Sequence, residues 1–473
     1  MFEISITGTD KLNPYEELIK VFLQPSEYVL LKEGQEAGMA ETASTEHLSY
    51  HFSGDADEIK RQIYRNLSSR TGKYPKWGIL TGIRPVKLAW ELTRGSRAGQ
   101  LVAKAGTGCE QILQDRYLLH PSKAALTQEI LDYQLSCAGD PPQKSLSVYI
   151  GIPFCPTRCL YCSFTSNQVG EGEILRYLAA LEQEIDYAGE AAIRDGFQIE
   201  SIYIGGGTPT TLDAAQLDSL LGRIRERFDL SHIREFTVEA GRPDTFTEQK
   251  LAVLRSHGVD RISINPQTMH QQTLDLIGRR HTVEQTEEAF AMAKEAGFRS
   301  INTDLIAGLP GEDAPDFAES LDQILALGAD NITVHTLAVK RASRLKEMDE
   351  NYHYRNEQVR EEMLTQAEQR LRKADFRPYY LYRQKHTTGN TENIGYCRDD
   401  KISVYNIRIM EERQSILALG AGGISKIYFP AENRLERVAN VSNYEIYIDR
   451  IDEMKDRKRK GFFGQTQASQ ERR

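Results

Sequence analysis

Between residues 146 and 334 the sequence alternates short apolar runs with amphipathic helical segments. Ile174 and Leu178 lie on one apolar helical face, and Thr282 and Gln285 have the spacing of a capping box. Strand–helix units in this order pack as a parallel sheet with right-handed crossovers. Six of them predict an α/β fold, a partial (β/α)6 barrel open on one side, with functional residues on loops at the C-terminal strand ends. The runs expected as strands are 148–152, 202–204, 236–238, 261–264, 301–306 and 332–334.

The flanking regions lack this regular alternation. Before residue 140, short apolar runs and helical sequence suggest an α+β unit, and the stretch Gly139-Asp140-Pro141-Pro142 breaks the pattern as a linker does. We therefore predict three domains: an N-terminal α+β accessory domain (1–140), the partial barrel (145–345), and a C-terminal, mostly helical extension and tail on the substrate side (346–473).

A glycine-punctuated segment, KWGILTGIRP, lies at residues 76–85 of the N-terminal region. Gly82 and Pro85 mark a turn into a helix over residues 86–93. We interpret the segment as a packed loop between domains. A helix N-terminus beside Arg84 could alternatively hold an anion.

Three cysteines, Cys155, Cys159 and Cys162, occur within eight residues on the loop that leaves the first predicted strand. Three thiolates cannot complete a four-coordinate structural zinc site. They could hold three irons of a [4Fe–4S] cluster and leave the fourth iron open for a ligand. The alternatives are scattered structural cysteines or a zinc site completed by a distant histidine. We expect the remaining cysteines, Cys109, Cys137 and Cys397, to be ordinary thiols.

Composition excludes several classes of protein. A net charge of −9 argues against nucleic acid as a partner. No apolar run approaches the length of a membrane span, and the first ten residues lack the pattern of a signal peptide. Six cysteines in 473 residues do not form a disulfide framework. We expect a cytoplasmic protein with no membrane span and no nucleic-acid partner.

Polar residues follow the later strands. The stretch Gly205-Gly206-Gly207-Thr208 would let a ligand approach the backbone closely, although tight turns use glycines equally often. A lone carboxylate at a strand end is more often a helix cap than a ligand. Here four polar residues fall at successive units of one face, where they could bind a polar ligand together. They are Glu239, Gln267, Arg279 and Asp304.

The Cys-x3-Cys-x2-Cys spacing, with an aromatic residue before the last cysteine, resembles the radical S-adenosylmethionine (radical SAM) superfamily. The preceding Tyr-x-x-Ile-Pro-Phe-Cys resembles the oxygen-independent coproporphyrinogen III oxidase/dehydrogenase family, and the segment at 77–85 is similar to its HemZ-like branch. The resemblance implies a [4Fe–4S] cluster on Cys155, Cys159 and Cys162. It also implies S-adenosyl-L-methionine beside Tyr149, Gly206, Gly207, Thr208, Glu239, Gln267, Arg279 and Asp304.

This resemblance implies oxidative decarboxylation of coproporphyrinogen III propionates to vinyl groups, giving protoporphyrinogen IX in haem biosynthesis, with reduced flavodoxin or ferredoxin as electron donor. It assigns no catalytic side chain. The cations Arg341, Arg344, Arg383 and Lys385 are candidates for binding propionates by location only.

Two departures from the family pattern leave other functions open. Phe164 stands where the established dehydrogenases have a further cysteine, as in haem-chaperone relatives. Those relatives bind haem through a His-Asn-x-x-Tyr-Trp segment, whereas here His386 is separated from 393–396 and the tryptophan is missing. The alternatives are a haem-binding or haem-delivery protein that retains the cluster and SAM site, or a radical SAM enzyme acting on another tetrapyrrole.

Overall fold

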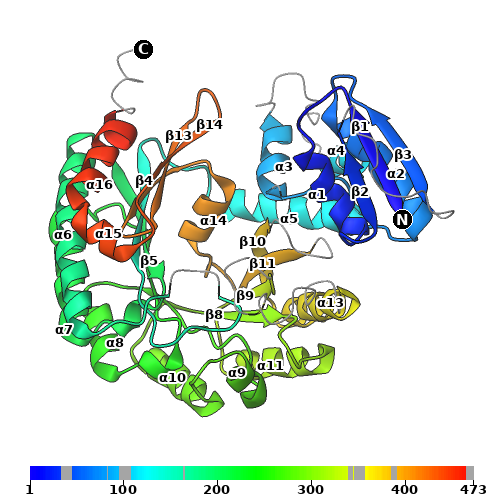
Figure 1. The fold of residues 1–473 in the computed structure, drawn as a ribbon. Helices are drawn as coiled ribbons and strands as arrows, with labels where there is room; N and C mark the ends of the chain where they lie inside the picture. The colour runs from blue at the N-terminus through cyan, green and yellow to red at the C-terminus, as the bar shows by residue number, and fades with distance from the viewer. Residues whose placement is uncertain are drawn as a thin grey trace.

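The computed structural model describes residues 1–32, 45–82, 84–94, 108–162, 166–338, 345, 357–384 and 391–464. These residues form two β-sheets (Figure 1). One has three strands in the order β2-β1-β3, and the other has eleven in the order β10-β11-β9-β8-β7-β6-β5-β4-β12-β13-β14. No helix within the described ranges is long and apolar enough to cross a membrane.

Six consecutive parallel strands form the centre of the large sheet, which confirms the predicted α/β fold and its six strand units. The helices between them cover the outer face of the curved sheet (Figure 1). The strands are β4 (Ser145–Ile152), β5 (Gln198–Gly206), β6 (Glu235–Glu239), β7 (Arg261–Ser263), β8 (Ser300–Ala307) and β9 (Asn331–Thr336). The helices are α6 (Glu171–Arg194), η1 (Pro209–Thr211), α7 (Ala214–Arg227), η2 (Pro243–Thr245), α8 (Glu248–Ser256), α9 (Gln271–Leu276), α10 (Val283–Glu295) and α11 (Ala314–Ala326).

Side chains that cap the helix N-termini fix where these helices begin. The predicted capping box of Thr282 and Gln285 is present at α10, and Asp213 with Gln216 forms another at α7. Each box satisfies backbone N–H groups that the first helical turn leaves unpaired. Helix α10 ends just before Gly297, which has a φ of 71°.

The central strands alternate apolar and polar side chains. Val148 and Ile150 of β4 are buried in the main apolar core. The intervening Ser147 and Tyr149 meet polar or aromatic neighbours instead: Ser147 Oγ is 2.7 Å from Ser201 Oγ, and the Tyr149 ring stacks near that of Tyr203. Since successive strand residues face opposite sides of a sheet, the inner face of the partial barrel is polar.

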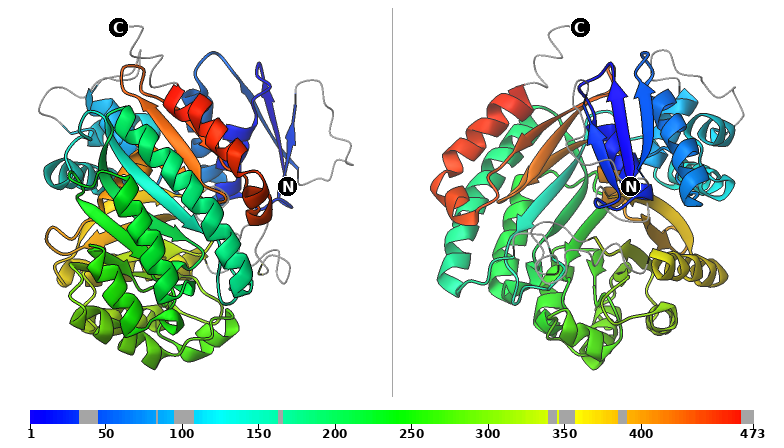
Figure 2. Two further views of the ribbon diagram at one scale, coloured as in Figure 1. Left: turned by 90° about the vertical axis from the view of Figure 1, so that its left-hand side faces the viewer. Right: turned by 45° about the vertical axis from the view of Figure 1, so that its right-hand side comes forward.

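The described residues of the C-terminal extension, which is expected to be mostly helical, hold more helix than strand but also supply five strands to the same sheet. Strand β12 pairs parallel to β4, and β11 pairs antiparallel to β9, so the sheet is extended at both ends. The strands are β10 (Arg377–Arg383), β11 (Glu392–Cys397), β12 (Ser415–Leu419), β13 (Ile424–Phe429) and β14 (Arg434–Ala439). The helices are α13 (Glu357–Lys373), α14 (Val404–Glu411), α15 (Tyr444–Asp449), α16 (Ile451–Arg457) and η5 (Lys458–Phe463). Helices α15 and α16 pack on α6 (Figures 1 and 2).

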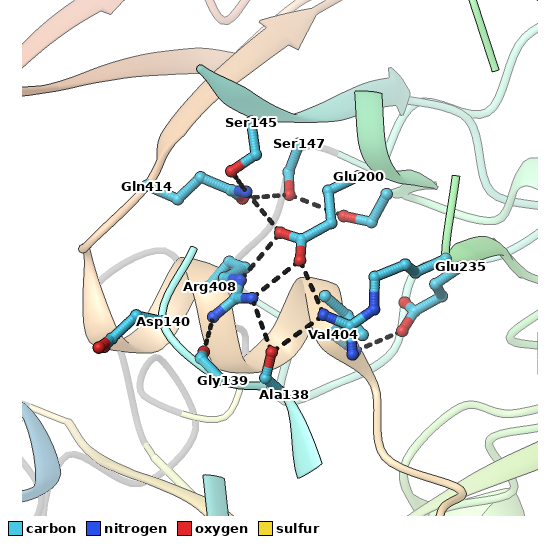
Figure 3. A network of polar contacts seen from close by, with 12 residues as sticks. Ala138, Gly139, Asp140, Ser145, Ser147, Glu200, Glu235, Val404, Arg408 and Gln414 are labelled. Carbon is cyan, nitrogen blue, oxygen red and sulfur yellow. Dashed lines mark hydrogen bonds and ion pairs between the residues drawn. The ribbon is translucent and has the colours of Figure 1, made fainter. Parts of the chain in front are cut away.

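Helix α14 is attached to the start of β5 by a buried polar network (Figure 3). Arg408 Nε and Nη2 donate to the Glu200 carboxylate at 2.9 and 2.8 Å, and Gln414 Nε2 donates to Ser145 Oγ at 2.7 Å. Arg408 Nη1 and Nη2 also donate to the carbonyls of Gly139 and Ala138, at 2.8 and 3.2 Å. The stretch predicted as a linker is therefore held against α14.

The N-terminal region forms the small sheet and five helices. Its helix α5 reaches the large sheet and packs on β10 (Figure 1). Trp77 Nε1 donates to Glu392 Oε2 of β11 at 2.7 Å, and the Lys123 ammonium pairs with the same carboxylate. The elements are β1 (Phe2–Thr7), α1 (Asn13–Phe22), β2 (Tyr28–Leu31), β3 (Glu46–His51), α2 (Ala56–Thr71), α3 (Pro85–Arg94), α4 (Glu110–Tyr117) and α5 (Pro121–Cys137).

Candidate functional site

The three cysteines follow β4 on a loop that packs against the turn after α9. Leu160 N donates to Ile277 O at 2.8 Å, and Thr208 Oγ1 donates to Cys155 Sγ at 3.6 Å. Burial raises the pKa of Cys155 to about 11; the Thr208 hydrogen bond opposes the rise, and Cys162 and Cys159 add to it. The three thiols are therefore close enough to interact electrostatically, and binding a cation would favour their thiolate forms.

The thiols are not arranged around a single ion. Within the described ranges, no three His, Cys, Asp or Glu side chains are placed to coordinate one metal ion. In a cubane cluster each thiolate binds a different iron, so its ligands need not converge on one point.

Two buried arginines anchor the cysteine loop, and sequence analysis identified only one of them. Arg242 Nη1 donates to Thr157 Oγ1 at 2.5 Å, while its Nε and Nη2 bind the Asp244 carboxylate at 2.9 and 2.8 Å. Arg279 Nη1 donates to Tyr161 Oη at 2.9 Å. The structure thus places Arg279 behind the cysteine loop, where it fixes the loop's shape.

The glycines that end β5 allow close approach to this loop. A Cβ on Gly207 would lie 2.4 Å from Phe154 O and 2.9 Å from Cys155 Sγ. Gly206 has a φ of 114°, which a residue with a side chain rarely adopts. A larger residue at either position would push β5 away from the cysteines.

Glu239 lies next to these glycines at the end of β6. Its Oε2 accepts from Gly206 N at 3.2 Å, and its Oε1 accepts from Tyr203 Oη. Burial raises the pKa of Glu239 to about 7; the Tyr203 bond opposes this rise and the charge of Asp304 adds to it. Near neutral pH the carboxyl is therefore poised between its two forms, and a cationic ligand would favour the ionised one.

Asp304 begins a chain of contacts that runs to β10. Its Oδ2 is 3.5 Å from His335 Nε2, and His335 Nδ1 is 3.1 Å from Tyr382 Oη. Burial would raise the pKa of Asp304, but His335 and Asn302 lower it overall. His335 is therefore the partner of a predicted site carboxylate.

Gln267 combines an unusual backbone with an unpaired side-chain atom. Its φ is 77°, a region that residues with side chains seldom occupy outside functional sites. Its backbone pairs with β8: Gln267 N donates to Asp304 O at 3.1 Å. The buried Gln267 Oε1 and Asn265 Oδ1 have no hydrogen-bond partner among the residues that the structure describes. Two buried acceptors are thus available beside Asp304.

Tyr149 belongs to an aromatic stack on the inner face of the sheet. Its ring centroid is 6.4 Å from that of Tyr203 and 6.3 Å from that of Tyr405, and those two are 4.5 Å apart. Sequence analysis missed Tyr203 and Tyr405. The alternation of β5 could have identified Tyr203, whereas Tyr405 comes from α14.

Several residues singled out in the sequence, namely Phe164, Arg341, Arg344, Lys385 and His386, lie outside the described residues. Arg383 is described and is buried. It donates to Leu80 O, and its guanidinium lies 5.2 Å from the Trp77 ring centroid.

Comparisons with known proteins identify the family to which this chain is similar. The family model of the radical SAM superfamily matches residues 149–324. The oxygen-independent coproporphyrinogen-III oxidase-like protein HemZ of Bacillus subtilis is 41% identical over 403 residues, covering 84% of this chain and 79% of HemZ. The heme chaperone HemW of Bacillus subtilis is 38% identical over 196 residues, which cover 41% of this chain and 51% of HemW.

A solved structure supports the fold. Coproporphyrinogen III oxidase (HemN) from Escherichia coli, described as a radical SAM enzyme, matches with a TM-score of 0.52 at 23% identity. The match covers 68% of this chain and 73% of that one. The fold of this chain is thus one found in a solved protein.

Proposed function

Because this chain belongs to the radical SAM superfamily and, within it, to the HemZ family, we propose that it oxidatively decarboxylates propionates of coproporphyrinogen III to vinyl groups, giving protoporphyrinogen IX. The observation that carries the proposal is the 41% identity with HemZ across most of both chains. The match covers 84% of this chain and therefore extends well beyond the radical SAM domain at residues 149–324.

We propose that Cys155, Cys159 and Cys162 ligate a [4Fe–4S] cluster and that S-adenosyl-L-methionine binds beside them. The residues present fit that molecule: buried acceptors without partners, two carboxylates, and glycines that leave room for a ligand next to a thiol. The proposed contacts are Tyr149, Gly206, Gly207, Thr208, Glu239, Gln267, Arg279 and Asp304.

When bound, the cluster and S-adenosyl-L-methionine would supply a 5′-deoxyadenosyl radical by one-electron reductive cleavage. The protein's part is to hold and shield the reactants. Glu239 offers a carboxylate to a cationic group, and His335 keeps Asp304 ionised. The stacked rings of Tyr149, Tyr203 and Tyr405 would pack beside the bound molecule on the inner face.

In each round a propionate side chain would lose one hydrogen atom from its β-carbon. Loss of carbon dioxide and of one electron to an acceptor then leaves a vinyl group. We propose reduced flavodoxin or ferredoxin as the electron donor and the cytoplasm as the location.

The second candidate function is haem binding or delivery with the cluster and SAM site retained, and the 38% identity to HemW favours it. Only 41% of the chain takes part in that match, compared with 84% for HemZ. The decarboxylase is therefore our first proposal.

The two functions are separated by incubating reconstituted, reduced protein with S-adenosyl-L-methionine and coproporphyrinogen III without oxygen. The proposal expects protoporphyrinogen IX and carbon dioxide by mass spectrometry. Absence of both, together with a stoichiometric Soret band on titration with haem, would establish the chaperone function instead.

A further inference from the structure

A pocket of about 490 Å³ lies where the N-terminal region meets the C-terminal strands, apart from the cysteine loop. Its volume is in the range of small-molecule sites. We call it the Arg84 pocket. It is lined by Gly82, Arg84, Lys87, Leu88, Tyr382, Arg383, Met410, Glu412 and Arg437.

Positive charge is in excess in this pocket. Four cations, Arg84, Lys87, Lys426 and Arg437, share the single carboxylate of Glu412. At neutral pH the four cations exceed the one negative charge of Glu412 by three. The neighbouring Glu411 does not balance them with a full charge, because burial raises its pKa to about 7.

The crowding affects the pKa of Lys426. Burial, together with the charge of Arg84, lowers that pKa to about 8. Like charges held this close destabilise a fold unless a counter-charge offsets them. An anionic ligand in the pocket would supply that counter-charge.

The backbone conformation of Glu412 supports a role for the Arg84 pocket in binding a ligand. Glu412 ends helix α14 with a φ of 52°, where glycine would fit without strain. The chain instead keeps a glutamate there, with its carboxylate buried among the cations. The strained residue thus positions Arg84, Lys87 and Arg437 around the pocket.

The remaining pocket wall is apolar or aromatic, formed by Leu88, Met410 and the ring of Tyr382. Cations beside apolar surface suit an apolar ring system that carries carboxylates better than a small hydrophilic anion. Tyr382 also connects the pocket to the candidate site, because its hydroxyl lies 3.1 Å from His335 Nδ1 and His335 pairs with Asp304.

We propose that the Arg84 pocket binds carboxylate groups of the substrate, the propionates that are not being decarboxylated. The identification of the ligand as a tetrapyrrole rests on the proposed function, whereas the preference for a carboxylate-bearing apolar ring rests on the pocket. The N-terminal region thereby forms part of the substrate site, through Arg84 and Lys87 of the segment at α3.

The test is a fluorescence titration with coproporphyrin III, the air-stable oxidised analogue with the same four propionates. Its tetramethyl ester is the ligand control, because it lacks the charges. The variants are R84Q and R437Q, with R176Q, an exposed arginine of α6, as the matched control. We expect about tenfold weaker binding in each pocket variant, little change in R176Q, and much weaker binding of the ester.

Thermal unfolding checks that the variants are folded. Arg437 is 56% exposed, so R437Q removes no buried group and keeps the test valid if R84Q misfolds. Equal binding of the ester, or unchanged binding in folded R437Q, would overturn the inference. Competition by inorganic pyrophosphate as strong as by coproporphyrin would show a phosphate site and would also overturn it.

The test of the Arg84 pocket can fail or succeed independently of the test of the proposed function. Charge-dependent coproporphyrin binding without any decarboxylation would keep this pocket and reject the enzyme. Formation of protoporphyrinogen with an unchanged KM in both pocket variants would keep the proposed enzyme activity and reject the role of the pocket.

Discussion

The chemistry of Glu239 is set by its surroundings. An exposed glutamate has a pKa of about 4.3, but this one is buried at the end of β6 and its pKa is raised to about 7. Because the folded pKa exceeds the unfolded one, the carboxyl contributes stability that is fully present below about pH 4.5. That contribution is lost as the pH rises through 7.

Glu239→Gln should remove this pH dependence. Between pH 5 and pH 8 the free energy of unfolding of the ligand-free wild type should fall as Glu239 ionises. The corresponding fall in the ligand-free variant should be smaller by roughly 3 kcal/mol. Denaturant titrations at the two pH values measure the difference. Glu411, which has a similarly raised pKa, is unchanged in both proteins and acts as an internal control. Parallel pH profiles would contradict the account.

The backbone of Gln267 predicts a difference between two substitutions. At a φ of 77°, Gln267→Gly relieves strain that Gln267→Ala retains, so the glycine variant should be more stable by roughly 1 kcal/mol. Both lose the amide and should bind S-adenosyl-L-methionine equally weakly in a calorimetric titration. Equal stability of the two variants would show that the conformation is not strained.

The cysteines predict the outcome of reconstitution. Alanine at Cys155, Cys159 or Cys162 should abolish the broad visible absorption and the bound iron of anaerobically reconstituted protein. Cys109→Ala is the matched control, since Cys109 is buried in the N-terminal region. Retention of about four irons in a triple alanine variant would place the cluster elsewhere.

At the scale of secondary-structure elements, the sequence predicted the six central strands and the α10 capping box because both depend on local patterns. It did not predict β10 to β14, whose pairing with β9 and β4 depends on contacts distant in the chain. The same limit explains the site. Glu239 ends β6 and Asp304 lies within β8, so the strand pattern identified both. Tyr405 instead reaches the stack from α14, more than 200 residues after Tyr149 and Tyr203.

The attachment of α14 to β5 depends on a buried ion pair (Figure 3). Arg408→Met leaves Glu200 buried without its main partner and should destabilise the protein by about 3 kcal/mol. The double variant Arg408→Met/Glu200→Gln removes both charges and should recover most of this loss. Chemical denaturation compares them. A double variant no more stable than the single one would contradict the ion-pair explanation.

At the scale of the whole molecule, one sheet joins the central strands to the C-terminal region, and the N-terminal region is connected to it through Trp77 and Glu392. The three domains predicted at 1–140, 145–345 and 346–473 stay a prediction, although the sheet itself continues across residue 345. The pocket beside Arg84 shows why such junctions are hard to predict: its cations come from α3, β13 and β14 and meet only after folding.

The central claim is that this chain performs radical SAM chemistry on coproporphyrinogen III. It is tested most directly by anaerobic measurement of 5′-deoxyadenosine formed by the reconstituted, reduced protein with and without that substrate. The account predicts that 5′-deoxyadenosine rises with coproporphyrinogen III, in step with protoporphyrinogen IX. Slow formation at the same rate with and without the substrate would contradict it.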